Sequence, residues 1–226
     1  MFDNLLNFWK GKDFLSQVLD EFREMLVDAQ DMFCCICRKL IDSQEIPSLK
    51  GKVYEVDKKI NSLQKDIRTR IVEHLSLRPS VDVSVCLLLM SVVKDAERLG
   101  DYCKNLYEVT QILKKPIDRL KYEEYFDSLE KEILELFSKT KDAFIKSDEV
   151  KAVLSWDHET KVIKRCEATI LKLAESNLSV NEAVCFTLTA RYFKRLAAHL
   201  ANIATSVILP INELDYFDKR RKEGEI

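Results

Sequence analysis

Glycine and proline are scarce in this chain. Its 226 residues contain four of each, whereas average usage of about 7% and 5% would give roughly sixteen and eleven. The glycines lie far apart, so the chain lacks the glycine-rich loops of dinucleotide-binding proteins and P-loop NTPases. The GxSxG elbow of the α/β-hydrolases is missing as well. Because a sandwich or barrel needs a turn every ~8–12 residues, the same shortage excludes an all-β fold.

The chain also lacks a surplus of one charge and long apolar runs. Its 36 basic and 38 acidic side chains give a net charge of −2. A generic nucleic-acid-binding protein carries a large basic surplus, so no nucleic-acid partner is expected, and the basic run from Lys219 to Lys222 is interpreted as a solvated tail. No apolar stretch approaches the ~18 residues of a membrane span, and the apolar opening MFDNLLNFW is short.

Histidine is rare, which limits the catalytic and metal sites available. The three histidines form no HExxH or paired zinc motif. None of them has a glutamate three positions before it, as the ExxH motifs of ferritin-like di-iron proteins require. The CxxC formed by Cys34 and Cys37 has no second pair, so it is interpreted as buried and apolar. No nucleophile with a recognisable base can be named. We therefore expect no enzyme.

Seven cysteines make an odd count, and no secretory signal peptide precedes them. Disulfides are rare in the reducing cytosol and common in secreted proteins. The cysteine count and the missing signal therefore predict a cytoplasmic protein with free thiols.

Apolar residues recur every three or four positions along most of the chain, which predicts amphipathic helices. Proline and glycine fall between these segments. The pattern predicts six long helices, at about 14–41, 53–78, 81–116, 122–145, 149–175 and 180–209. Long helices joined by short turns pack antiparallel, so the expected fold class is all-α, with two tandem three-helix bundles.

An internal repeat supports this division. A shift of 97 positions sets VVKDAERLGDYCKNLYE (92–108) over TARYFKRLAAHLANIAT (189–205) without a gap. Four pairs of like residues align: Lys94 with Arg191, Arg98 with Arg195, Leu99 with Leu196, and Asn105 with Asn202. The repeat indicates duplication of a three-helix unit, with domains at 1–116 and 117–226.

The acidic segment Asp95 to Asp101, DAERLGD, is the strongest candidate site. Glu97 and Asp101 are four residues apart, so both carboxylates lie on one face of the predicted helix. Their mutual repulsion must be offset, either by a neighbouring base such as Arg98 or by a bound cation.

The preceding helix is expected to add ligands to this site. In an antiparallel hairpin centred on Pro79, Asp57 lies opposite Asp101, and Asn61 lies opposite Glu97. Oxygen ligands converging at one level suit Mg, Mn, Ca or Fe. The alternative is an acidic face that nearby lysines and arginines neutralise without any metal.

Three segments of the first half resemble the PhoU family of phosphate-uptake regulators. DAERLGDYCKN is similar to its DLERIGD-like motif. LSLRPSVDVSVCLLL (75–89) is similar to its LALRQPVAxDLRLLL segment, and VYEVDKKINSLQKDI (53–67) to its EADDEIDALEREI helix. The second copy is degenerate, because Tyr192, Lys194 and Ala198 replace three acids, so no second metal site of equal strength is expected.

This resemblance implies two three-helix bundles and a non-enzymatic adaptor in the cytoplasm. Its implied partners are a phosphate ABC transporter ATPase, a sensor histidine kinase or both, and a second copy of the chain in a homodimer. It also implies a divalent or iron-type metal ion at Glu97 and Asp101, with Asp95 adjoining and Asp57 from the preceding helix. The alternative function is a metal-free helical scaffold or interaction module.

Overall fold

The computed structural model describes residues 13–214, and every regular element in this part of the chain is a helix. The all-α prediction is confirmed. The elements are α2 (Asp13–Ile41), α3 (Leu49–Leu77), α4 (Val83–Ile112), α5 (Arg119–Phe126), α6 (Leu129–Lys146), α7 (Glu149–Ala174), α8 (Val180–Thr205) and a 3₁₀ turn, η1 (Ile211–Glu213). The basic run at 219–222 and the apolar opening both lie outside the described residues.

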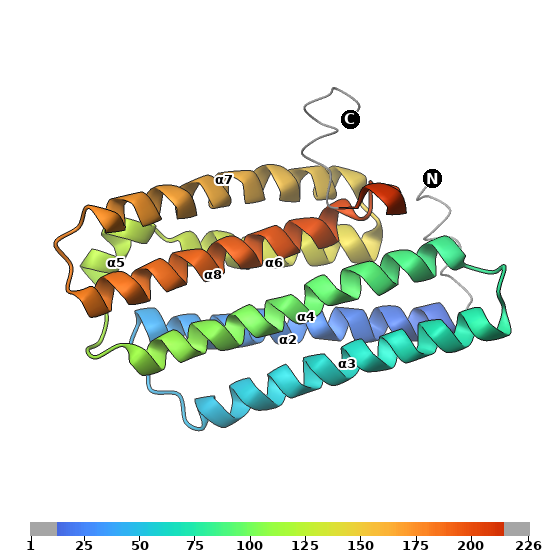
Figure 1. The fold of residues 1–226 in the computed structure, drawn as a ribbon, viewed down its shortest axis with the longest axis horizontal. Coiled ribbons are helices and arrows are strands. Elements are labelled where there is room, and N and C mark those ends of the chain that lie inside the picture. The colour runs from blue at the N-terminus through green and yellow to red at the C-terminus, as the bar shows by residue number, and fades with distance from the viewer. Residues whose placement is uncertain (1–12, 215–226) are drawn as a thin grey trace.

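The helices form two groups that lie against each other (Figure 1). Helices α2, α3 and α4 pack together, as do α6, α7 and α8, and α4 contacts α8 while α2 contacts α6. None of the helices between residues 13 and 214 is long and apolar enough to cross a membrane. The two groups agree broadly with the predicted pair of bundles.

Aromatic side chains join the two groups into one core. Phe33 of α2 lies 5.9 Å from Phe137 of α6 and 5.6 Å from Phe193 of α8, measured between ring centroids. Phe22 of α2 lies 4.6 Å from Phe144 of α6. Buried residues of both halves thus belong to one continuous hydrophobic cluster. The division at residues 116 and 117 and the duplication itself stay predictions.

The prediction of one helix over 122–145 was wrong. The structure has two helices here, because α5 ends at Phe126 and α6 begins at Leu129. Between them, Asp127 and Ser128 have φ of 45° and 57°. Residues other than glycine adopt this left-handed conformation at a cost of about 1 kcal/mol or more, so neighbouring groups must hold the break in place.

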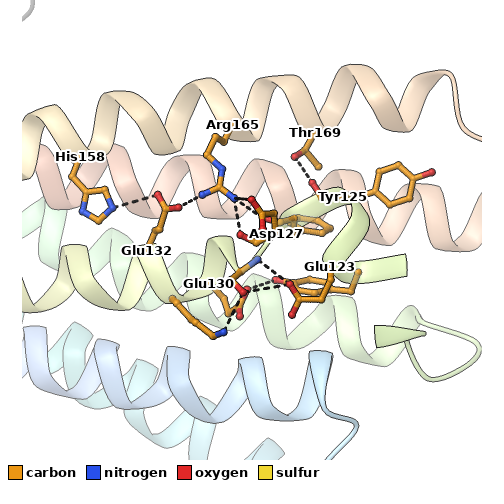
Figure 2. A network of polar contacts seen from close by, with 12 residues as sticks. Glu123, Tyr125, Asp127, Glu130, Glu132, His158, Arg165 and Thr169 are labelled. Atoms are coloured by element: carbon orange, nitrogen blue, oxygen red, sulfur yellow. Dashed lines mark hydrogen bonds and ion pairs between the residues drawn. The ribbon is translucent and has the colours of Figure 1, made fainter. Parts of the chain in front are cut away.

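Arg165 of α7 holds this break, as Figure 2 shows. Its Nη2 donates hydrogen bonds to the carbonyl oxygens of Phe126, at 3.0 Å, and Asp127, at 2.7 Å. Its Nη1 forms an ion pair with Glu132 of α6. Thr169, one turn further along α7, donates to the carbonyl of Tyr125 at 2.8 Å. Arg165 therefore satisfies carbonyls that the interrupted helix leaves unpaired.

Serine and aspartate take over the role of glycine at the helix ends. The residues with positive φ among those described are all of these two types: Ser43, Ser48, Asp82, Asp127, Ser128 and Ser147. Ser179 caps α8 in a capping box with Glu182, and Asp118 and Asp148 cap α5 and α7. Short polar side chains tolerate the left-handed region and satisfy free backbone groups, which explains how a glycine-poor chain still turns.

We predict that Arg165→Met lowers the free energy of unfolding by about 2 kcal/mol, because the carbonyls of Phe126 and Asp127 and the Glu132 carboxylate lose a charged donor. Urea denaturation followed by circular dichroism measures this loss. Lys161→Met, at an exposed position on the same helix, is the matched control. An equal effect of both substitutions would contradict the role of Arg165.

Candidate functional site

Asp57, Glu97 and Asp101, here called the acidic cluster, lie between α3 and α4. The Lys104 ammonium sits between two of them, with Nζ 2.8 Å from Oδ1 of Asp57 and 3.1 Å from Oδ1 of Asp101. Burial alone would lower the pKa of Lys104, but its hydrogen bonds to both carboxylates raise it instead. The register predicted from the hairpin around Pro79 therefore does bring Asp57 and Asp101 to one level of the bundle.

Arg98 and Asn61 complete the contacts of the acidic cluster. Nη1 of Arg98 lies 2.9 Å from Oδ2 of Asp101, and its Nε lies 3.7 Å from Oε2 of Glu97. Asn61 Nδ2 donates to Oδ2 of Asp57 at 3.5 Å. The cluster thus receives positive charge from two side chains of α4 itself.

Glu97 is the member of the cluster with the least favourable surroundings. Burial raises its pKa above the ordinary value of 4.5, and the nearby Asp101 carboxylate raises it further. Arg98 and Lys104 act in the opposite direction but do not outweigh these effects. Negative charge on Glu97 is therefore only partly compensated.

The cluster does not form a ready metal site. Within residues 13–214, no three histidine, cysteine, aspartate or glutamate side chains are placed so that they could hold one metal ion together. Lys104 supplies positive charge between Asp57 and Asp101, where one of the two predicted alternatives placed a metal ion. The arrangement corresponds to the alternative in which basic side chains neutralise the carboxylates, and metal binding stays a prediction.

Asp95, the fourth predicted ligand, points away from the acidic cluster. Its Oδ1 lies 2.7 Å from Nδ1 of His199 and 3.2 Å from Nδ2 of Asn202, both on α8. Asp95 therefore belongs to the contacts between α4 and α8, here called the α4–α8 interface.

Tyrosines extend this interface. Tyr102 stacks on His199 with ring centroids 5.5 Å apart, and it lies 6.0 Å from Tyr192. Under the 97-residue shift, position 95 corresponds to 192 and position 102 to 199. The predicted repeat thus relates the contact of Asp95 with His199 to the contact of Tyr192 with Tyr102. The correspondence between these positions can be derived from the sequence repeat. Counting residues from the turn at Pro79 cannot give it, because that count covers only one half of the chain.

Gly100 serves close packing between α3 and α4. A Cβ at this position would lie 3.1 Å from Cδ1 of Ile60, and both residues are buried. The space beside the acidic motif is therefore filled by an isoleucine side chain from α3. Gly100 allows the two helices to approach closely at the level where Asp57, Asp101 and Lys104 meet.

The pKa of Glu97 predicts a pH-dependent effect of Glu97→Gln. An acid with a raised folded-state pKa binds more protons when folded, so its contribution to stability is present below the ordinary pKa and declines as pH rises. The variant should match the wild type near pH 4 and be more stable at pH 7. Urea denaturation at both values measures this difference.

Glu135→Gln provides a control of opposite sign. A hydrogen bond from Lys139 lowers the pKa of Glu135, so its contribution is present above the ordinary pKa and is lost as pH falls. This variant should be less stable than the wild type at pH 7 and equal to it in acid. If Glu97→Gln were also less stable at pH 7, a cation would be stabilising the Glu97 carboxylate.

Residues 16–110 match the family model described as the PhoU domain. A curated relative, the phosphate-specific transport system accessory protein PhoU homolog 1 of Thermotoga maritima, is 29% identical over 100 residues. That alignment covers 42% of this chain and 42% of the relative, so the chain matches less than half of that protein's length.

Two solved structures share the fold. PhoU from Pseudomonas aeruginosa has a TM-score of 0.76 at 20% identity, over 86% of this chain and 95% of its own. The phosphate transport system regulatory protein PhoU from Streptococcus pneumoniae has a TM-score of 0.74 at 18% identity, over 96% of this chain and 97% of its own. The likeness in fold extends through the second half, beyond the family-model match.

Proposed function

We propose that the chain, whose residues 16–110 match the PhoU domain, is a PhoU-family protein and a non-enzymatic regulator of a phosphate transport system. The observation that carries this proposal is the PhoU domain match, because its range includes all three segments on which the sequence resemblance rests. The similar fold over most of the chain supports a protein built on the same plan.

The partners in this proposal follow from the resemblance. They are the ATPase of a phosphate ABC transporter, a sensor histidine kinase or both, reached from the cytoplasm. Long helices with short connections present preformed surfaces, which suits an adaptor that binds other proteins. The homodimer expected from the resemblance stays a prediction.

A deletion of the gene in the host tests this role. We predict that cells without the protein misregulate a phosphate-starvation reporter in phosphate-rich medium, and that the wild-type gene restores control. Purified protein should also bind the purified transporter ATPase of the same host. Normal reporter activity and normal phosphate uptake in the deletion strain would count decisively against the regulatory role.

The acidic cluster has two candidate roles within this function. In the first, Lys104 links Asp57 and Asp101 and fixes α3 against α4, so the motif is structural. The geometry of the lysine favours this role. In the second role, a divalent or iron-type metal ion binds the carboxylates of Asp57, Glu97 and Asp101. The raised pKa of Glu97 favours the metal-binding role, since a cation would relieve the uncompensated negative charge.

Lys104→Met distinguishes the two roles. If Lys104 is the native cation, the wild type should have the same melting temperature in EDTA and in Mn²⁺. The variant should melt lower in EDTA, because two carboxylates lose their partner, and Mn²⁺ should restore part of the loss. Lys139→Met, at a surface ion pair on α6, is the control. A wild type that loses stability in EDTA would instead support the metal site.

A further inference from the structure

One face of α4 is exposed and carries an unusual sequence of side chains. Val83 and Leu87 are 38% and 47% exposed, and Lys94 and Arg98, further along the helix, are exposed as well. Their spacings of four, seven and four residues place them on one stripe of the helix. The stripe is therefore apolar near the start of α4 and basic near its middle.

Helix α8 repeats this stripe. Val180 and Val184 are 82% and 47% exposed, and Arg191 and Arg195 are exposed on the same side of the helix. Each of the four positions corresponds to one of the α4 stripe under the 97-residue shift. Exposed apolar and basic residues thus recur at equivalent positions, whereas the acids of the motif do not.

The two stripes join into one surface because α4 and α8 lie side by side and antiparallel (Figure 1). Asp95 contacts both His199 and Asn202, so position 95 lies level with about position 200. At about 1.5 Å per residue, Lys94 and Arg191 are separated by about 15 Å along the helix axes. The four basic residues therefore occupy the middle of the joint surface.

The apolar residues lie at its two ends. By the same register, Leu87 and Val184 are about 36 Å apart along the helix axes. We call the surface the outer face, and it consists of Val83, Leu87, Lys94 and Arg98 from α4 and Val180, Val184, Arg191 and Arg195 from α8. Along the helix axes its pattern is apolar, basic, apolar.

Most of the positive charge on the outer face has no partner in the described part of the chain. Arg98 pairs with Asp101. Lys94, Arg191 and Arg195, by contrast, form no hydrogen bond or ion pair with any residue between 13 and 214. The whole chain has a net charge of −2, so this concentration of unpaired cations is a local feature rather than part of a general basic surplus.

We propose that the outer face binds an acidic amphipathic helix of a partner protein. The four basic residues of the outer face are complementary to acidic side chains in the middle of the partner helix. The exposed valines and leucine select apolar side chains near both ends, as in binding of a helix along a groove. A span of about 36 Å corresponds to about 24 residues of helix, so a single helix can reach both ends.

Other occupants satisfy only part of the pattern. A second copy joined two-fold through this face would bring four basic residues onto four basic residues, and like charges placed together oppose association. A nucleic acid would satisfy the arginines through its phosphates but would leave the apolar ends without partners. The acidic helix is the occupant that matches both features.

This inference rests on the proposed function in one respect, since an adaptor needs a surface for its partner. The probe is a synthetic helical peptide of about 28 residues, with glutamates in its central turns and leucines near both ends. Fluorescence anisotropy measures its binding to the full chain, and added salt should weaken that binding.

Two pairs of variants test the two parts of the outer face. Arg191→Gln with Arg195→Gln should weaken peptide binding about tenfold, whereas Lys161→Gln with Lys164→Gln, an equal charge change at exposed positions of α7, should not. Circular dichroism establishes that each variant remains folded.

The apolar ends are tested in the same way. Leu87→Ser with Val184→Ser should also weaken binding, whereas Leu171→Ser, at a residue of α7 that is 71% exposed, should leave it unchanged.

Several results would overturn the docking proposal. These are no binding of the peptide, equal losses in the test and control variants, or tighter binding of a DNA duplex that displaces the peptide. A homodimer that dissociates in the Arg191 and Arg195 variant would assign the face to a second copy and would also overturn it.

The docking proposal and the regulatory role fail separately. If the deletion strain loses reporter control but the outer-face variants bind the peptide normally, only the docking proposal fails. If the deletion strain behaves normally while the variants lose peptide binding, only the phosphate role fails.

Discussion

The packing of α4 against α8 is the contact on which the rest of the structure depends. It joins two groups of three long helices through Asp95, His199 and the tyrosines beside them, over a shared aromatic core. Because α4 and α8 each pack against two helices of their own group and against each other, one side of each remains exposed. Those two sides lie next to each other, so the contact that holds the halves together also creates the outer face.

The side chains of the acidic motif on α4 point in three different directions. Asp95 faces α8, Glu97 and Asp101 face α3, and Arg98 lies exposed between them and pairs with Asp101. Helical periodicity explains this division, because positions two residues apart, such as 95 and 97, point to opposite sides of a helix, whereas positions three or four apart share a face. Like charges four residues apart repel, and the lysine one turn further along the helix offsets that repulsion. Basic side chains on the same helix can therefore neutralise carboxylates whose spacing suggests a set of metal ligands.

The sequence predicts most of the fold, since apolar periodicity follows directly from burial of one helix face. It misses the break between α5 and α6, because Asp127 and Ser128 adopt positive φ only with Arg165 held against them from α7. It predicts the facing of Asp57 and Asp101, since a hairpin turn sets that register. It misses the partner of Asp95, which lies in the other half. Contacts between distant segments are not set by a local turn, and the 97-residue shift relates one such contact to another without saying which residues meet.

A rigid helical framework limits how such a protein can act on its partners. Serine and aspartate side chains cap the first turns of α5, α7 and α8, and Arg165 holds the break between α5 and α6. Binding on preformed helix faces orders little chain, so less free energy is lost in association. Affinity then depends on which side chains the faces carry. In this chain the equivalent positions of α4 and α8 carry exposed apolar and basic residues, whereas the acids of α4 have no counterparts on α8. The proposed recognition therefore uses the outer face, and in its structural role the acidic cluster sets the spacing of α3 and α4.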